Sequence, residues 1–160
     1  MALYILPAAE QSGPIPIAYP DCAGDVVVNR YEIDLAAAPL KGVTLGVGDL
    51  LDIGIIPATS QVVDVVIDSD DLDTGGSPAL TFDVGVLSGD PGTTGTRTCG
   101  TEFFAATNVA QAGGVVRTSK KEAFRVAAVA KDTSVGVKIT AAAATQATSG
   151  KIGVSVFVKG

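Results

Sequence analysis

Residues 79–87 read ALTFDVGVL, and this stretch decides the class of fold. Its apolar side chains alternate with polar or small ones, so that Leu80, Phe82, Val84 and Val86 fall on one face. Successive side chains of a β-strand point to opposite faces, and a period of two therefore predicts a strand with one buried side.

Further short apolar stretches, bounded by turn-forming residues, extend this prediction along the chain. The expected strands are residues 25–33, 50–57, 61–68, 79–87, 123–130, 134–141 and 151–159. In residues 61–68, the face expected to be buried consists of Val63, Val65 and Ile67. In residues 151–159, it consists of Ile152, Val154, Val156 and Val158.

One stretch, residues 101–111 (TEFFAATNVAQ), favours a short helix, because Thr101 can cap its start and Gly113 and Gly114 can stop it. The alanines of residues 141–144 are expected to end a strand and begin a loop. Helices do not alternate with the strands, which excludes a doubly wound α/β fold. We therefore predict an all-β, antiparallel jelly roll or β-sandwich with one short helix.

Residues 1–24 are expected to form an extended arm ahead of one domain over residues 25–160. Four prolines in the arm disfavour a helix or a central strand. The arm is nevertheless apolar, unlike most disordered tails, so we expect it to lie against its own domain or a neighbouring subunit. The candidate contact residues in it are Leu3, Tyr4, Ile5, Ile15, Ile17 and Tyr19.

The composition excludes several classes of active site. The chain of 160 residues has no His and two Cys, which removes His-dependent triads, His-ligated metals and a four-Cys zinc site within one chain. The glycine-rich residues 46–48 and 89–92 lack the Lys and helix of a phosphate-binding loop. A serine–lysine pair or a carboxylate pair built from distant residues stays open. We expect no enzymatic activity and no cofactor.

The first ten residues contain no basic segment of a secretory signal, and Pro7 interrupts their apolar run. The longest apolar stretches fall short of the roughly 20 residues of a membrane span. We therefore expect no membrane partner, synthesis in a cytoplasm, and free thiols at Cys22 and Cys99. The calculated pI of about 4.4 also disfavours nucleic acid as a partner.

The net charge of −6 hides a strong asymmetry along the chain. Residues 1–90 hold 14 acidic and 2 basic residues, a balance of −12, whereas residues 91–160 hold 3 acidic and 9 basic residues, a balance of +6. The two halves can neutralise each other within one fold if their strands interleave. They can also provide complementary patches between subunits.

The densest acidic stretch is residues 68–73, DSDDLD, in which Asp70, Asp71 and Asp73 are candidates for contact with a partner. Such a stretch could also surround Ca²⁺. The spacing of an EF-hand fails, however, because Leu72 and Ala79 occupy positions where that loop needs oxygen ligands. We favour a solvated acidic hairpin loop between two strands.

The strongest basic stretch is residues 117–121, RTSKK, followed by Arg125. It is either a solvated turn or a surface that meets an acidic neighbour, with Arg117, Lys120 and Lys121 as the candidate contacts. Exposed charge pairs contribute well under ~1 kcal/mol each, so they would mainly set orientation and register.

Three stretches of the chain resemble the decoration proteins of tailed bacteriophages, which are also called cement or head-stabilising proteins. They are DDLD…PALTFDVGVLSG in residues 70–89, RTCGTEFF…AQAGG in residues 97–114, and AAT…GKIGVSV in residues 143–156. The resemblance covers residues 25–160 and is one of pattern and composition. It implies a jelly-roll-like domain that oligomerises on the outer face of an icosahedral head and clamps neighbouring major capsid subunits.

We therefore expect a non-enzymatic structural protein of the virion, located on the capsid surface. Its expected partners are the major capsid protein and further copies of itself, as a homodimer or homotrimer. The alternative is a carbohydrate- or ligand-binding β-sandwich module of a fibre or receptor-binding protein, which would need exposed aromatic residues on one sheet. The chain has three Tyr and no Trp, and two of the tyrosines lie in the arm, so this alternative has poor support.

Overall fold

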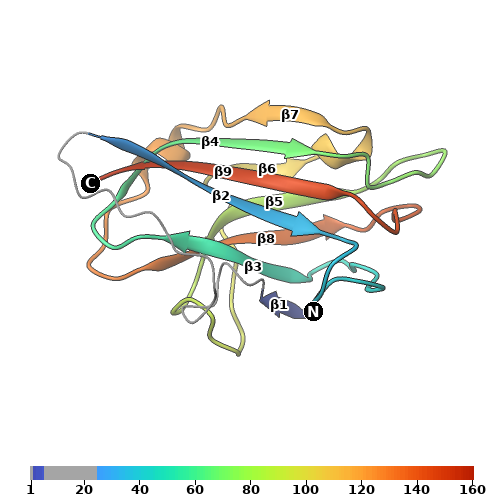
Figure 1. The fold of residues 1–160 in the computed structure, drawn as a ribbon, viewed down its shortest axis with the longest axis horizontal. Coiled ribbons are helices and arrows are strands. Elements are labelled where there is room, and N and C mark those ends of the chain that lie inside the picture. The colour runs from blue at the N-terminus through green and yellow to red at the C-terminus, as the bar shows by residue number, and fades with distance from the viewer. Residues whose placement is uncertain (1, 6–24) are drawn as a thin grey trace.

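Two β-sheets pack face to face in the computed structural model, which describes residues 2–5 and 25–160 (Figure 1). The strands are β1 (Leu3–Ile5), β2 (Val26–Asp34), β3 (Leu50–Ile56), β4 (Gln61–Ser69), β5 (Thr81–Leu87), β6 (Phe104–Thr107), β7 (Gly114–Arg117), β8 (Thr133–Ala141) and β9 (Lys151–Lys159). Two short 3₁₀ turns lie within the described residues, η2 (Val109–Gln111) and η3 (Lys121–Arg125).

The order of the strands identifies the fold as a jelly roll. One sheet has the order β2-β9-β4-β7, and the other has the order β1-β3-β8-β5-β6. Strands β2 to β9 pair first with last, as β2 with β9, β3 with β8, β4 with β7 and β5 with β6, all antiparallel. This is the pairing of one long hairpin wound into two sheets, the winding of a jelly roll. The all-β prediction is confirmed.

The core between the sheets follows the predicted alternation with one shift. In β9, Ile152, Val154, Val156 and Val158 are all buried, as predicted. In β4 the pairing with β9 is irregular between Val62 and Asp64. A bulge of this kind reverses the faces on one side of it, so Val62 is buried and Val63 is only half-buried. The prediction was therefore wrong at Val63 and correct at Val65 and Ile67.

Two predicted elements differ in the structure. The predicted helix over residues 101–111 is replaced by β6 and η2, because Phe103 and Phe104 are buried in the core and β6 pairs with β5. The predicted strand over residues 123–130 is replaced by the end of η3 and an extended segment outside both sheets. Its sequence, AFRVAAVA, is apolar but lacks the strict alternation of a half-buried strand. The loop predicted after Ala141 is present.

Strand β1 places the start of the chain against its own domain. It pairs in parallel with β3, at the edge of the five-stranded sheet. The Ala2 backbone N–H donates to Asp49 Oδ1 at 2.7 Å, and Tyr4 packs against the core. The other apolar arm residues, Ile15, Ile17 and Tyr19, lie outside the described residues, so the arm beyond β1 stays a prediction.

Gly54 in β3 allows the two sheets to approach each other closely. A Cβ built on Gly54 would overlap the ring of Tyr31, whose hydroxyl donates to the carbonyl oxygen of Ile55. We expect Gly54→Ala to lower the free energy of unfolding by about 1–3 kcal/mol, as overpacking of a core does. Gly76→Ala is the matched control, because a Cβ there meets nothing within 4 Å. Denaturant unfolding of both variants tests this, and equal stabilities would contradict it.

Candidate functional site

The charge asymmetry of the sequence is partly neutralised within the fold. Strand β9 from the basic half lies between β2 and β4 from the acidic half, as Figure 1 shows. Lys151 of β9 pairs with Glu32 of β2 at 2.6 Å, and Arg117 of β7 pairs with Asp64 of β4 at 2.7 Å. The predicted interleaving of the two halves is thus present in the described part of the chain.

Arg30 lies across the outer face of the four-stranded sheet. Its guanidinium reaches from β2 over Gly153 of β9 to Asp68 of β4, with Nη2 and Oδ2 at 2.8 Å. A Cβ on Gly153 would overlap the guanidinium, so the glycine leaves the space for this pair. The hydrogen bond from Arg30 holds the pKa of Asp68 below its usual range.

Asp73 differs from the expected solvated residue. Its side chain is buried, and its two oxygens accept the backbone N–H groups of Ala79, Leu80, Ala144 and Thr145 at 2.6–3.1 Å. Burial on its own raises the pKa of a carboxyl, but these four donors outweigh it and hold the pKa of Asp73 well below its usual range. Asp73 therefore joins two loops inside the protein, and the prediction that it contacts a partner is wrong because its side chain is buried.

The acidic stretch, residues 68–73, does not form the predicted hairpin loop. A hairpin joins two neighbouring strands of one sheet, whereas this stretch leads from β4 in one sheet to β5 in the other. Asp70 and Asp71 are exposed and stay candidates for contact. Asp70 accepts the N–H of Lys151 at 2.9 Å, and Asp71 accepts the N–H of Asp73 at 3.1 Å. These carboxylates are directed to separate partners, and no group of three or more metal-ligating side chains converges anywhere in the described residues.

The predicted basic stretch forms part of the surface next to η3. Arg117 is exposed and pairs with Asp64, while Lys120 Nζ donates to the carbonyl and hydroxyl oxygens of Thr101. Lys121 is exposed. Thr118 is buried, and its hydroxyl donates to the carbonyl oxygen of Phe103 at 2.7 Å. The stretch is thus anchored at Thr118 and presents its charges outward.

A buried ion pair that the sequence did not indicate lies under the loop between β5 and β6. Asp52 of β3 is fully buried and pairs with Arg97, which is 4% exposed. Arg97 Nη2 also donates to Ser134 Oγ at 2.9 Å, and its Nε donates to the carbonyl oxygen of Ser88 at 2.6 Å. The sequence gives little indication of this cluster, because Asp52, Arg97 and Ser134 are 37 to 82 residues apart along the chain. The pair fixes this loop to the sheet.

Cys99 lies within the loop between β5 and β6 and is a free, half-buried cysteine among the described residues. Burial and the nearby carboxylates of Asp83 and Glu102 raise the pKa of its thiol to about 12. A thiol with such a pKa is a poor nucleophile at neutral pH. Cys22 lies outside the described residues.

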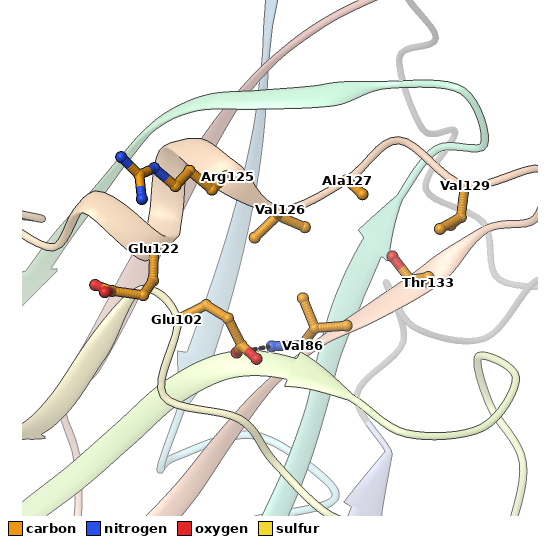
Figure 2. A pocket seen from close by; sticks show the side chains of 8 residues that line it. All are labelled: Val86, Glu102, Glu122, Arg125, Val126, Ala127, Val129 and Thr133. Carbon is orange, nitrogen blue, oxygen red and sulfur yellow. Dashed lines mark hydrogen bonds between the residues drawn. The ribbon is translucent and has the colours of Figure 1, made fainter.

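An exposed apolar segment and a groove beside it are the main surface feature that the sequence reading missed. The segment is residues 124–130, which begins with the last two residues of η3 and is apolar except for Arg125; Phe124 is 39% and Val129 45% exposed. A groove of about 470 Å³ runs along the segment, and Figure 2 shows Val126, Ala127 and Val129 on one side of it. Val86 and Thr133 lie on the other side, with Glu102 and Glu122 at one end. The sequence predicts a strand over residues 123–130, and the missing alternation of its side chains is the signal against that prediction.

Aromatic side chains for stacking on a sugar are scarce on the described surface. Tyr31, Phe82, Phe103 and Phe104 are buried, and Tyr4 and Phe157 are half-buried, so Phe124 is the exposed aromatic residue of the described part of the chain. The structure therefore gives no specific support to the carbohydrate-binding alternative.

The comparison with solved structures decides the family. Over 99% of both chains, this protein is 42% identical to a chain of the structure "Capsid of Ralstonia phage GP4", with a TM-score of 0.88. The chain belongs to a family of bacteriophage capsid proteins. A chain of the cyanophage Pam1 capsid asymmetric unit is 25% identical, with a TM-score of 0.61, over 94% of this chain and 96% of that one.

Other comparisons extend or limit this result. The acidic stable capsid of Helicobacter pylori bacteriophage KHP30 contains a chain that shares the fold, with 12% identity, a TM-score of 0.53 and coverage of 86% and 89%. Searches with models of protein families and against curated proteins give no match. In the described part of this capsid protein, neither 3₁₀ turn is long or apolar enough to cross a membrane. The capsid protein is a structural component of the virion.

Proposed function

We propose that this capsid protein is a decoration protein, which binds the outer surface of an icosahedral head as a homo-oligomer and cements neighbouring major capsid subunits. The observation that carries the proposal is the match to a phage capsid chain over the full length of both chains. The resemblance of residues 70–89, 97–114 and 143–156 to decoration proteins supports this specific role.

The physical design of the molecule suits such a role. Its jelly roll is held by paired strands in both sheets and by buried polar links at Asp73 and Arg97, so its surface is presented on a rigid support. Exposed charges at Asp70, Asp71 and Lys121 provide contacts of both signs on this surface. Contacts of modest strength become strong when the symmetry of a head repeats them many times.

Heads that lack this protein provide the direct test. We expect such heads to assemble, to bind the purified protein on their outer surface in electron micrographs, and to release DNA at a lower temperature until the protein is added. The double variant Asp70→Lys, Asp71→Lys should bind more slowly and with altered salt dependence, as charges at the rim of an interface do. Asp90→Lys, at another exposed acidic position, is the control for the added charge.

Two results would contradict the proposal. If heads fail to form without the protein, it is a building block of the shell itself. If it is found inside the head or absent from its surface, a decoration role is wrong.

A further inference from the structure

Residues 126–130, VAAVA, form an apolar wall beside a groove. Val126 is half-buried, and the other four residues are exposed. The groove of about 470 Å³ separates this wall from Val86 of β5 and Thr133 of β8 (Figure 2). Val86 and Val126 also pack against the core, so an apolar ligand in the groove would extend the core. A continuous apolar group beside a groove of this size is typical of a binding site.

The groove lies close to the point where the arm leaves the described part of the chain. Strand β1 ends at Ile5, whose register partner in β3 is Asp52. Four residues further along β3, Ile56 is the register partner of Thr133, which lines the groove. Four residues of a strand span roughly 13 Å. Strand β3 therefore leads from the start of residues 6–24 to one wall of the groove.

The groove also lies close to the point where the described chain resumes after the arm. Val26, the first residue of β2, pairs with Lys159 of β9, and Lys159 pairs with Gln61 of β4. Two residues before Gln61, the Thr59 N–H donates to the Val129 carbonyl oxygen at 2.7 Å. Val129 belongs to the apolar wall, so both ends of residues 6–24 are fixed near the groove.

The length of the arm and its attachment favour the groove of the same chain. Residues 6–24 are 19 residues, and an extended chain of this length spans up to roughly 60 Å. They can thus reach the groove from either end. Because both ends are joined to the domain that holds the groove, the effective concentration of the arm there is high, of the order of mM for a short flexible connection.

The sequence of the arm suits an apolar groove. In residues 14–20, PIPIAYP, the large apolar side chains Ile15, Ile17 and Tyr19 alternate with proline and alanine. In an extended chain such alternation directs the three side chains to one face. The prolines favour an extended backbone and have no N–H that needs an acceptor, so this segment can dock through its side chains alone.

We propose that residues 15–19 of the arm dock in the groove beside residues 126–130 of the same chain. Ile15, Ile17 and Tyr19 then contact the apolar wall and Val86. This contact is a property of the free chain, so it does not depend on the decoration role. It assigns a binding site to the arm residues that the sequence predicts to make contacts.

A single tryptophan can report the docking, because the chain contains none. In Tyr19→Trp we expect the fluorescence maximum at a shorter wavelength than that of N-acetyltryptophanamide, with several-fold slower quenching by acrylamide. Adding Val129→Asp places a charge in the groove and should bring both values close to those of the free amide. Val47→Asp is the matched control at an exposed valine before β3, and it should change neither value.

A pair of cysteines distinguishes the groove of the same chain from that of a neighbour. With Cys22→Ser and Cys99→Ser as the background, Ile17→Cys combined with Val129→Cys should form a disulfide within a monomer on mild oxidation. A disulfide needs Cα atoms about 4.4–6.8 Å apart, so the bond reports direct proximity. The control pair, Ile17→Cys with Val47→Cys, should react about tenfold more slowly or less. Peptide mass spectrometry and non-reducing gels identify the products.

The docking is wrong if the tryptophan is as accessible as the free amide, or if Val129→Asp leaves its fluorescence unchanged in a variant that circular dichroism shows to be folded. Disulfide-linked dimers in place of monomers would put the arm in a neighbour's groove and contradict docking within one chain. Binding to heads is measured separately. A folded Val129→Asp variant that still binds heads would leave the decoration role intact, and docking without head binding would do the reverse.

Discussion

Asp73→Ala is expected to remove about 3–5 kcal/mol from the free energy of unfolding, which is a large share of the 5–15 kcal/mol of a typical domain. The substitution leaves four backbone N–H donors without their acceptor, and a buried unsatisfied donor costs about 1–3 kcal/mol. Water that enters between the two loops recovers part of the loss. Asp73→Asn should cost less, about 1–3 kcal/mol, because one amide oxygen can still accept.

The dependence of this loss on pH gives a second test. The pKa of Asp73 is lower in the folded protein than the ordinary value of about 3.9, so its carboxylate stabilises the fold above that pH. The contribution is lost as the pH falls through the folded-state pKa. The difference in stability between the wild-type protein and Asp73→Asn should therefore be full at neutral pH and shrink below about pH 4.

Denaturant unfolding at several pH values measures both effects. Asp90→Ala is the control, because Asp90 is exposed and its substitution should change the stability by less than about 0.5 kcal/mol. A loss at Asp73 that is as small as the loss at Asp90, or that does not change with pH, would show that the four hydrogen bonds do not stabilise the loops.

Arg97→Met is the second substitution with a large expected effect, about 3–5 kcal/mol. It leaves the Asp52 carboxylate buried without its cation, and Asp52 Oδ1 already has no hydrogen-bond partner among the described residues. It also releases Ser88 and Ser134 from the guanidinium, so the loop between β5 and β6 should open. We expect faster proteolysis in residues 88–98 as well as lower stability.

A double variant separates the loss of the pair from the burial of a charge. Asp52→Asn together with Arg97→Met removes the unpaired charge, so it should be more stable than Arg97→Met alone. Arg30→Met is the control, because its partner Asp68 is exposed and the pair should contribute less than about 1 kcal/mol. A double variant less stable than the single one would contradict the assignment of Asp52 as the cause.

Much of the fold could be predicted because it follows from short-range patterns of apolar, polar and turn-forming residues. The alternation in residues 79–87 and 151–159 and the turns between the strands predicted the sandwich and most of its buried residues. The same reasoning failed where tertiary contacts override local preference. Residues 101–111 have a helical composition, yet burial of Phe103 and Phe104 and pairing with β5 make part of them a strand.

The candidate surfaces could be predicted only in part. The charges of Asp70, Asp71, Arg117 and Lys121 are on the surface, as their sequence context indicated. Asp73 is adjacent to these acids in sequence but is buried, because the loop after β8 surrounds it with N–H donors. No local pattern distinguishes Asp73 from its neighbours, since two of its four donors come from residues 71 and 72 positions away.

The sequence by itself determined the class of fold, the absence of His-dependent chemistry and the division of charge between the two halves. Each of these follows from composition or from a short-range period. Only the tertiary structure decided the jelly-roll order of the strands, the burial of Asp73, the pair of Asp52 with Arg97, and the exposure of residues 124–130. These features depend on which distant segments meet, and that is fixed by packing of the whole chain rather than by any single stretch of it.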